Sequence, residues 1–204
     1  MIILKRIIEI FFSIILLIFL FSIILLIILL IIFFFKEGPI FFKQERIGIN
    51  GRTFIIYKFR TMFNNAENEL KNILDNNPKL NNEYSKNCKL ENDPRIIGKI
   101  GIFLRRTSLD EIPQFINIIK GDMTFVGPRP FLKDEIIVFK DKFEKLCSVK
   151  PGITGLWQVS GRNNLNLKQR VELDIKYIDT KSFFNDITII FKTFIVIFQK
   201  KGAC

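Results

Sequence analysis

The chain of 204 residues is long enough for one packed domain with an appendage. Its 31 lysines and arginines against 20 aspartates and glutamates give a formal net charge of +11. It contains no histidine, so acid–base chemistry or metal binding must use carboxylates, which favours Mg²⁺ over Zn²⁺. The basic excess fits nucleic acid, anionic lipid head groups or a phosphorylated substrate. We expect no nucleic-acid partner, because the chain has no known binding motif and no aromatic platform among its basic residues.

The first expected element is a long apolar helix. Residues 10–35 are a run of 26 without charge, in which Ser13 and Ser22 are the only polar side chains. At ~1.5 Å per residue a helix of this length reaches about 39 Å, more than the ~30 Å hydrocarbon core of a bilayer. Basic residues on both flanks favour a re-entrant helix with both ends in the cytoplasm, but with Ser22 as its only candidate break a straight span stays open. The sequence therefore predicts a membrane-embedded helix at 1–36 and a cytoplasmic domain at 37–204.

A β-hairpin is expected next. Asn50-Gly51 is a type I′ turn signal, and residues 53–61 read as the returning strand. On that strand Lys58 and Arg60 share one face, ~7 Å apart. This pair is either a solvated surface or the cationic wall of a phosphate pocket.

The rest of the chain reads as short helices with a brief strand among them. Residues 64–92 are rich in asparagine and predict a peripheral insert. Helices are expected at 113–119, ended by Gly121, and at 165–178. The apolar stretch 187–198 is too short to span a bilayer and predicts an interfacial helix. The fold class is therefore α/β, mostly helical with a small β-hairpin or sheet.

Two adjacent carboxylates, Asp110 and Glu111, carry the strongest chemical signal. Their setting among arginines and beside a helix start favours ionised acids, as suits a nucleophile or a hard-metal ligand. The structural alternative is a capping box, in which Ser108 caps a helix and Glu111 reaches back to it. Pro113 weakens this alternative, since it suits the first helical position better than the fifth. A helix that starts at Pro113 would place both acids just ahead of it.

Three arginines suit a phosphate ligand. Arg105 precedes the carboxylate pair, Arg129 is held between two prolines, and Arg162 follows a glycine. Asp174 falls within the apolar stripe of the helix at 165–178, and an acid there must be paired or hydrogen-bonded. It is either a structural ion-pair partner of an arginine or a site acid.

Together these motifs resemble one family. They are Tyr57-Lys58-Phe59-Arg60-Thr61-Met62, residues 105–111, Lys120-Gly121-Asp122-Met123, Val126-Gly127-Pro128-Arg129-Pro130, Pro151-Gly152-Ile153-Thr154-Gly155, Gly161-Arg162-Asn163 and Glu172-Leu173-Asp174. In this order they resemble the bacterial sugar transferases, also called small monotopic phosphoglycosyl transferases, over nearly the whole chain. The resemblance implies transfer of a sugar-1-phosphate from a UDP-sugar to polyprenyl (undecaprenyl) phosphate at the cytoplasmic face of the bacterial inner membrane, with release of UMP. Such a reaction starts the assembly of a lipid-linked glycan.

The resemblance also implies roles for individual residues. Asp110 matches the nucleophile that holds a covalent phosphosugar, and Glu111 matches its Mg²⁺-binding neighbour. The expected substrate-binding residues are Lys58, Arg60, Arg105, Arg129, Arg162 and Asp174. One departure concerns the apolar helix, where Ser22 is followed by Ile23 instead of the proline that many members carry.

The alternative function is a non-catalytic basic scaffold that binds acidic lipids or a partner glycan enzyme. The intact Asp110-Glu111 pair with its arginines argues against a scaffold. Membrane lipids are expected partners of either kind of protein. Downstream glycosyltransferases or a second copy of this chain are further candidate partners.

Overall fold

The computed structural model describes residues 2–35, 38–87, 90, 92–133, 135, 139–162 and 165–199. The helices are α1 (Ile2–Phe19), α2 (Phe21–Phe35), α3 (Ala66–Asp75), α4 (Pro78–Asn87), α5 (Gly98–Arg106), α6 (Gln114–Lys120), α7 (Phe143–Leu146), α8 (Leu156–Val159), α9 (Leu167–Thr180) and α10 (Phe183–Gln199). The strands are β1 (Phe41–Ile47), β2 (Thr53–Phe59), β3 (Thr124–Val126) and β4 (Gly152–Thr154). Asn163 of the motif at 161–163 lies outside the described residues, as do parts of the segments 1–36 and 64–92.

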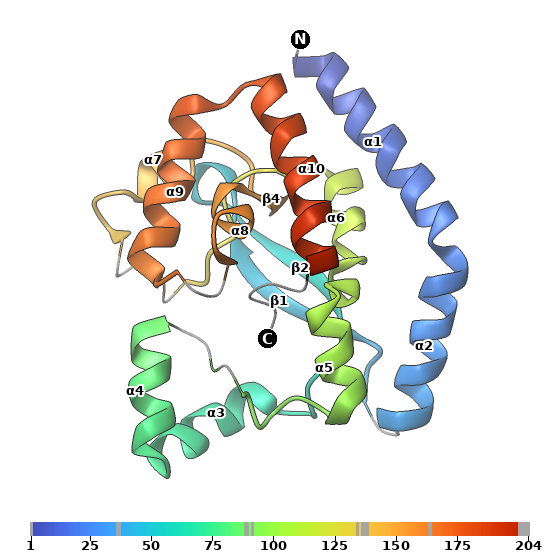
Figure 1. Ribbon diagram of the computed structural model, residues 1–204, viewed down its shortest axis with the longest axis vertical. Coiled ribbons are helices and arrows are strands. Elements are labelled where there is room, and N and C mark those ends of the chain that lie inside the picture. Colours follow the sequence, from blue (N-terminus) through green and yellow to red (C-terminus); the bar gives the residue numbers. More distant parts are fainter. Residues whose placement is uncertain are drawn as a thin grey trace.

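The described chain is mostly helical with two small sheets, which confirms the expected α/β class. Strands β1 and β2 pair antiparallel, with Phe41 opposite Phe59. Asn50 and Gly51 both have positive φ, as the turn signal predicted. The turn differs in length, because Ile49–Gly51 forms a 3-10 turn and the connection exceeds two residues. In Figure 1 this hairpin lies in the middle of the molecule, behind α10 and α6.

The second sheet is a parallel pair, in which Val126 of β3 lies opposite Thr154 of β4. Gly127 follows β3, and a Cβ there would lie 2.6 Å from the carbonyl oxygen of Lys150 and 2.8 Å from the amide nitrogen of Gly152. Only glycine fits such a close approach of two backbones. This contact holds the end of β3, from which the Pro128–Pro130 turn starts.

The apolar N-terminal segment forms two helices. The axes of α1 and α2 differ by 60°, and the break lies at Leu20, two residues before the expected Ser22. Among the described residues, neither helix alone is long and apolar enough to cross a bilayer, but the bent pair passes that test by length and composition. Figure 1 shows α1 and α2 running along one side of the molecule, next to α6 and α5.

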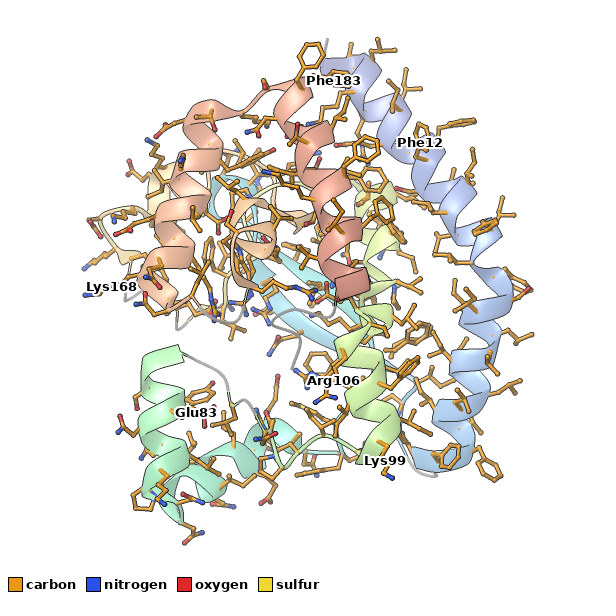
Figure 2. The ribbon with its side chains drawn as sticks, in the orientation of Figure 1. Phe12, Glu83, Lys99, Arg106, Lys168 and Phe183 are labelled. Atoms are coloured by element: carbon orange, nitrogen blue, oxygen red, sulfur yellow. The ribbon has the colours of Figure 1, made fainter. Side chains whose placement is uncertain are left out.

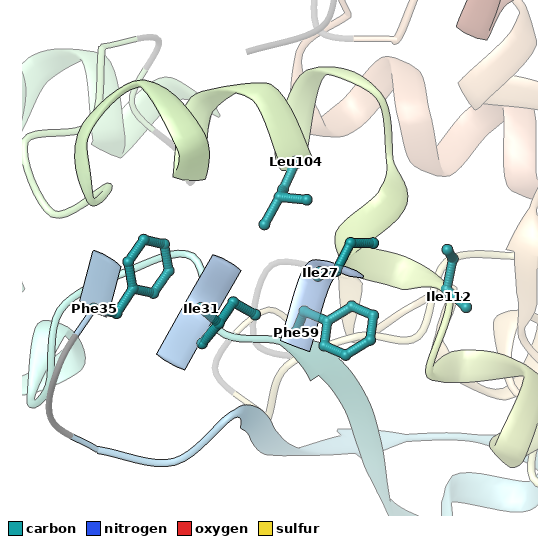
Figure 3. Close-up of a cluster of buried hydrophobic side chains, with 6 residues drawn as sticks. All are labelled: Ile27, Ile31, Phe35, Phe59, Leu104 and Ile112. Atoms are coloured by element: carbon teal, nitrogen blue, oxygen red, sulfur yellow. The ribbon is translucent and has the colours of Figure 1, made fainter. Parts of the chain in front are cut away.

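Helix α2 packs into the body of the domain. Ile27, Ile31 and Phe35 share one buried cluster with Phe59 of β2, Leu104 of α5 and Ile112 (Figure 3). Burial of side chains of this size stabilises a fold by ~1.5–3 kcal/mol each. The N-terminal segment is therefore structurally continuous with the domain that carries the site.

Two other expected elements appear with altered bounds. The insert forms two helices, α3 and α4, and Pro78 is the first residue of the second helix. Figure 1 shows these helices at the end of the molecule away from the N-terminus. The C-terminal helix α10 begins at Phe183 instead of residue 187. Four extra residues place Phe183 and Phe184 on its exposed apolar surface.

Candidate active site

The two carboxylates lie on a 3-10 turn, η2 (Leu109–Glu111), between α5 and α6. Ser108 has φ 56 and ψ 18, in the left-handed region, and its side chain makes no capping hydrogen bond. The capping-box interpretation is therefore wrong. Helix α6 begins at Gln114 directly after Pro113, so Asp110 and Glu111 stand ahead of it as the proline indicated. Their side chains are free for other partners.

Glu111 pairs with Lys58 of strand β2. Lys58 Nζ lies 2.7 Å from Glu111 Oε1. Burial would raise the pKa of Glu111, but Lys58 outweighs it with help from Arg162 and Arg129, and the pKa is lowered. Lys58 therefore faces the site instead of forming only a solvated surface, and Glu111 is ionised at neutral pH.

Asp110 is 7% exposed. Burial raises its pKa to about 6, and the negative charge of Glu111 adds to the rise, while Lys58 and Arg105 lower it. Asp110 is therefore still mostly ionised at neutral pH, as expected, although desolvation outweighs the nearby cations and raises its pKa. At pH 7 a pKa near 6 leaves about nine-tenths of the group ionised. A buried, weakly solvated carboxylate is more basic than an exposed one.

The Pro128–Pro130 turn presents Arg129 next to two acids. Arg129 Nη1 donates to Glu135 Oε1 at 3.0 Å. Its backbone N–H donates to Asp174 Oδ2 at 3.4 Å. Glu135 also accepts from the backbone N–H of Leu132 at 2.8 Å. Side chain and backbone of the arginine are thus held separately, which fixes the direction of its guanidinium.

Asp174 lies on the inward face of α9 and is 1% exposed. Its Oδ2 accepts a hydrogen bond from the backbone N–H of Arg129, whereas Oδ1 has no hydrogen-bond partner among the described residues. Burial raises its pKa well above the usual value, against the opposing effect of Arg129. The contact that it makes is to the arginine backbone, so it orients the turn that carries Arg129.

Arg162 contacts Ser108, the residue directly before the carboxylate turn. It donates from Nη2 to Ser108 Oγ at 3.0 Å, and its charge lowers the pKa of Glu111. Arg105, near the end of α5, lowers the pKa of Asp110. The expected residues Lys58, Arg105, Arg129 and Arg162 thus act on one carboxylate pair.

Arg60 directly follows strand β2, at the end of the hairpin. It is 6% exposed, its Nη1 donates to Asn64 Oδ1 at 2.7 Å, and its guanidinium lies 5.6 Å from the centre of the Phe35 ring. These contacts join β2 to the end of α2 and to the start of the insert. A substrate contact by Arg60 stays a prediction from the strand pattern.

Two charged residues of the site were not expected. Glu135 binds Arg129, and Arg46 of β1 donates to the carbonyl oxygen of Pro130 at 3.3 Å. Burial lowers the pKa of Arg46 to about 10, and the neighbouring Arg129 adds to this effect. From the sequence, Arg46 is identified only as one of the positive charges that flank the apolar helix. Glu135 lies six residues beyond Arg129, too far along an irregular segment for a periodic pattern to find it.

The carboxylates of this site could supply only some of the ligands of a Mg²⁺ ion. Among the described residues no three histidine, cysteine, aspartate or glutamate side chains gather into a metal site. Mg²⁺ commonly binds one or two carboxylates and completes its shell with water and substrate phosphates. The adjacent Asp110 and Glu111 fit an ion shared with a diphosphate, and do not fit a site built by protein ligands alone.

The fold and this site define a class: a small α/β domain with a bent apolar helix pair and a carboxylate pair set among basic side chains. Residues 1–200 match the bacterial sugar transferase family. The chain belongs to that family.

Several relatives share most of the domain. An undecaprenyl-phosphate galactose phosphotransferase from Salmonella typhimurium is 46% identical over 166 residues, which are 81% of this chain and 35% of that protein. The exopolysaccharide production protein ExoY from Sinorhizobium fredii is 42% identical over 81% of this chain and 73% of its own length. A UDP-glucose:undecaprenyl-phosphate glucose-1-phosphate transferase from Escherichia coli is 36% identical over 81% of this chain and 34% of its own. The matched region is thus about a third of the Salmonella and Escherichia proteins.

Proposed function

We propose that this protein transfers a sugar-1-phosphate from a UDP-sugar to undecaprenyl phosphate, releases UMP, and so initiates assembly of a lipid-linked glycan such as an exopolysaccharide. The observation that carries the proposal is the buried Asp110 beside the Glu111–Lys58 ion pair. Arg105 acts on Asp110, and Arg129 and Arg162 act on Glu111. An anionic nucleophile can attack a diphosphate only where the substrate charge is neutralised. This site gathers four cationic side chains around its carboxylate pair.

The chemistry proceeds through Asp110 in two displacements. A carboxylate oxygen attacks the phosphorus that bears the sugar, a P–O bond forms to the protein, and the bridging P–O bond breaks as UMP leaves. An oxygen of undecaprenyl phosphate then attacks the same phosphorus and frees Asp110. Arg105, Arg129 and Arg162 hold phosphate oxygens in both steps. Mg²⁺ bound by Glu111 would neutralise diphosphate charge.

The relatives support the substrates. The Salmonella and Escherichia proteins carry undecaprenyl phosphate in their names, together with galactose in one and glucose in the other. Their identity to this chain covers most of the described domain. A UDP-hexose is therefore the donor to test first.

The bent helix pair supports a membrane-anchored, monotopic arrangement. Both of its ends contact the domain: Lys5 Nζ lies 2.5 Å from Asp186 Oδ2, and Phe35 is part of the core. A straight span would carry one end away from the domain. Many apolar side chains of α1, α2 and α10 are exposed, among them Phe11, Phe12, Ile18, Phe19, Phe33, Phe183, Phe184 and Phe194. Figure 2 labels Phe12 and Phe183, which lie toward the same end of the molecule. We propose that these surfaces enter the cytoplasmic leaflet of the bacterial inner membrane.

The reaction is tested by supplying UDP-glucose or UDP-galactose, Mg²⁺ and undecaprenyl phosphate and measuring UMP. Asp110→Asn removes the nucleophile, and we expect turnover to fall at least about 1,000-fold. Asp75→Asn, on the exposed side of α3, is the matched control and should keep full activity. Undiminished turnover in Asp110→Asn would refute the covalent mechanism. Absence of UMP with every common UDP-sugar would instead favour the scaffold alternative.

The topology has a separate test. A cysteine at residue 2, in a chain whose own cysteines have been replaced, is exposed to a membrane-impermeant thiol reagent outside intact cells. The monotopic arrangement predicts labelling only after permeabilisation. A cysteine in place of Asn68, on the exposed insert, serves as the cytoplasmic reference. Labelling of residue 2 in intact cells would show a spanning helix.

A further inference from the structure

Two residues beside the site have a backbone conformation that their side chains disfavour. Four non-glycine residues in the described chain have positive φ: Asn50, Asn65, Ser108 and Arg162. Asparagine tolerates the left-handed region, whereas serine and arginine rarely adopt it. Such conformations are unfavourable for these residue types and gather at functional sites. Ser108 and Arg162 are also hydrogen-bonded to each other, although they are far apart in sequence.

The contact uses one edge of the guanidinium. Arg162 Nη2 donates to Ser108 Oγ at 3.0 Å, and Nη1 is buried without a hydrogen-bond partner among the described residues. A buried donor of this kind needs an acceptor. A phosphate oxygen entering beside Glu111 would supply one, because Arg162 is near enough to lower the pKa of that carboxyl.

Arg129 and Arg162 are held by different groups. Arg129 is paired with the carboxylate of Glu135, so part of its charge is compensated within the protein. Arg162 is held by a neutral hydroxyl, which fixes the direction of the guanidinium and leaves Nη1 for a ligand. Arg162 is therefore the better donor to an anionic group.

We propose that Ser108 is a positioning residue for substrate binding: its hydroxyl aims Arg162 at the diphosphate of the nucleotide sugar. The inference rests on the proposed function for the identity of the ligand. It gives Ser108 a role that the sequence pattern assigned to a helix cap. It also accounts for the left-handed backbone at both residues, since that conformation brings hydroxyl and guanidinium together.

The test uses UDP as the probe, because UDP carries the diphosphate and undergoes no transfer. Binding to the full chain in detergent is measured by calorimetry. Ser108→Gly removes the hydroxyl and accepts positive φ without strain, so we expect UDP affinity to fall about tenfold while the thermal midpoint stays at or above that of the wild type. Ser108→Asn tolerates the same backbone and offers Oδ1 as an acceptor, and it should recover most of the affinity.

Two controls separate positioning from folding. Asn65→Gly changes another left-handed residue, at the insert, and should leave UDP affinity unchanged. Arg162→Met should weaken UDP binding strongly in the wild type and much less in the Ser108→Gly background, because the two residues act as one unit. In turnover, Ser108→Gly should raise KM for the UDP-sugar more than it lowers kcat.

The outcomes distinguish the inference from the proposed reaction. Unchanged UDP affinity in Ser108→Gly, or no UDP binding by the wild type, overturns the inference. Weaker UDP binding in Ser108→Gly with no UMP release by the wild type supports the inference and refutes the proposed transfer. Equal losses in Ser108→Gly and Ser108→Asn, with a lower thermal midpoint in both, would show a purely structural role and overturn it.

Discussion

The two halves of the N-terminal segment are held to the domain by different forces. Helix α1 is held by polar groups: Arg6 donates from Nη2 to the carbonyl oxygen of Ile119 at 2.9 Å, Thr124 donates to Glu9, and Lys5 pairs with Asp186. Helix α2 is held by apolar side chains of the cluster around Ile31 (Figure 3).

The two kinds of contact have different effects: one fixes the orientation of the helix pair, and the other stabilises its packing on the domain. Hydrogen bonds are directional and fix which face of α1 meets β3 and α6, whereas burial of apolar area is nearly independent of direction. A helix as apolar as α2 could also turn the same side chains toward lipid. The polar contacts of α1 therefore determine the orientation of the helix pair on the domain, and the apolar contacts of α2 supply most of the stabilisation.

The largest expected effect is in α2. Ile31 is 1% exposed, so Ile31→Ala should lower the free energy of unfolding by ~3 kcal/mol through lost burial and a cavity. Denaturant unfolding of the full chain in detergent measures the change. Ile32→Ala, on the exposed side of the same helix, is the matched control and should cost much less. Equal losses in both variants would mean that α2 is not packed on the domain as Figure 3 shows.

The next effect concerns the polar contact of α1 with β3. Glu9→Leu leaves the buried hydroxyl of Thr124 without its acceptor and should cost ~2 kcal/mol. Glu9→Gln keeps an acceptor and should be nearly neutral. The double variant Glu9→Leu with Thr124→Val replaces both partners by apolar groups and should recover most of the loss. Full stability of Glu9→Leu alone would show that α1, like α2, is held by apolar contacts.

Local signals in the sequence predicted the parts of the fold that short-range rules control. The positive φ of Asn50 and Gly51 and the left-handed cap at Gly121 follow from residue types within each turn. Pro113 indicated that the carboxylates stand ahead of α6, and the structure confirms this. These features depend on neighbours a few residues away, so the sequence was sufficient.

Tertiary contacts determined the parts that the sequence did not predict. The sequence favoured a re-entrant helix but offered only Ser22 as the break, whereas the bend lies at Leu20. No proline or glycine marks Leu20, and its two helical hydrogen bonds, to the Leu16 carbonyl and from the Ile24 amide, are both intact at 2.8 Å. Docking of α1 and α2 on different parts of the domain accounts for the bend. The raised pKa of Asp110 likewise depends on burial, which adjacency to arginines could not reveal.

The ion pair between Arg129 of the Pro128–Pro130 turn and Glu135 lies inside the domain and can be compared with the polar contacts of α1. The pKa of Glu135 is lowered: burial raises it, but Arg129, the Leu132 amide and Arg46 outweigh burial. Ionised Glu135 therefore stabilises the fold above its unfolded pKa, and the stabilisation disappears as the pH falls. Glu135→Gln should lower the free energy of unfolding by ~1.5 kcal/mol at pH 7, and by much less at a pH below the lowered pKa of Glu135 in the folded protein. Glu45→Gln, in an exposed ion pair with Lys133, should show almost no effect at either pH.

The smallest effect is expected at the start of α1. The side chain of Lys5 is 37% exposed and pairs with Asp186, which also accepts a hydrogen bond from Tyr177. Lys5→Met should lower the free energy of unfolding by only ~0.5 kcal/mol, because solvent screens the pair and Tyr177 still satisfies Asp186. The difference from the wild type should shrink further in 1 M salt, where the Debye length is ~3 Å. A loss as large as that of Glu9→Leu, insensitive to salt, would place the main polar attachment of α1 at Lys5 instead of Glu9.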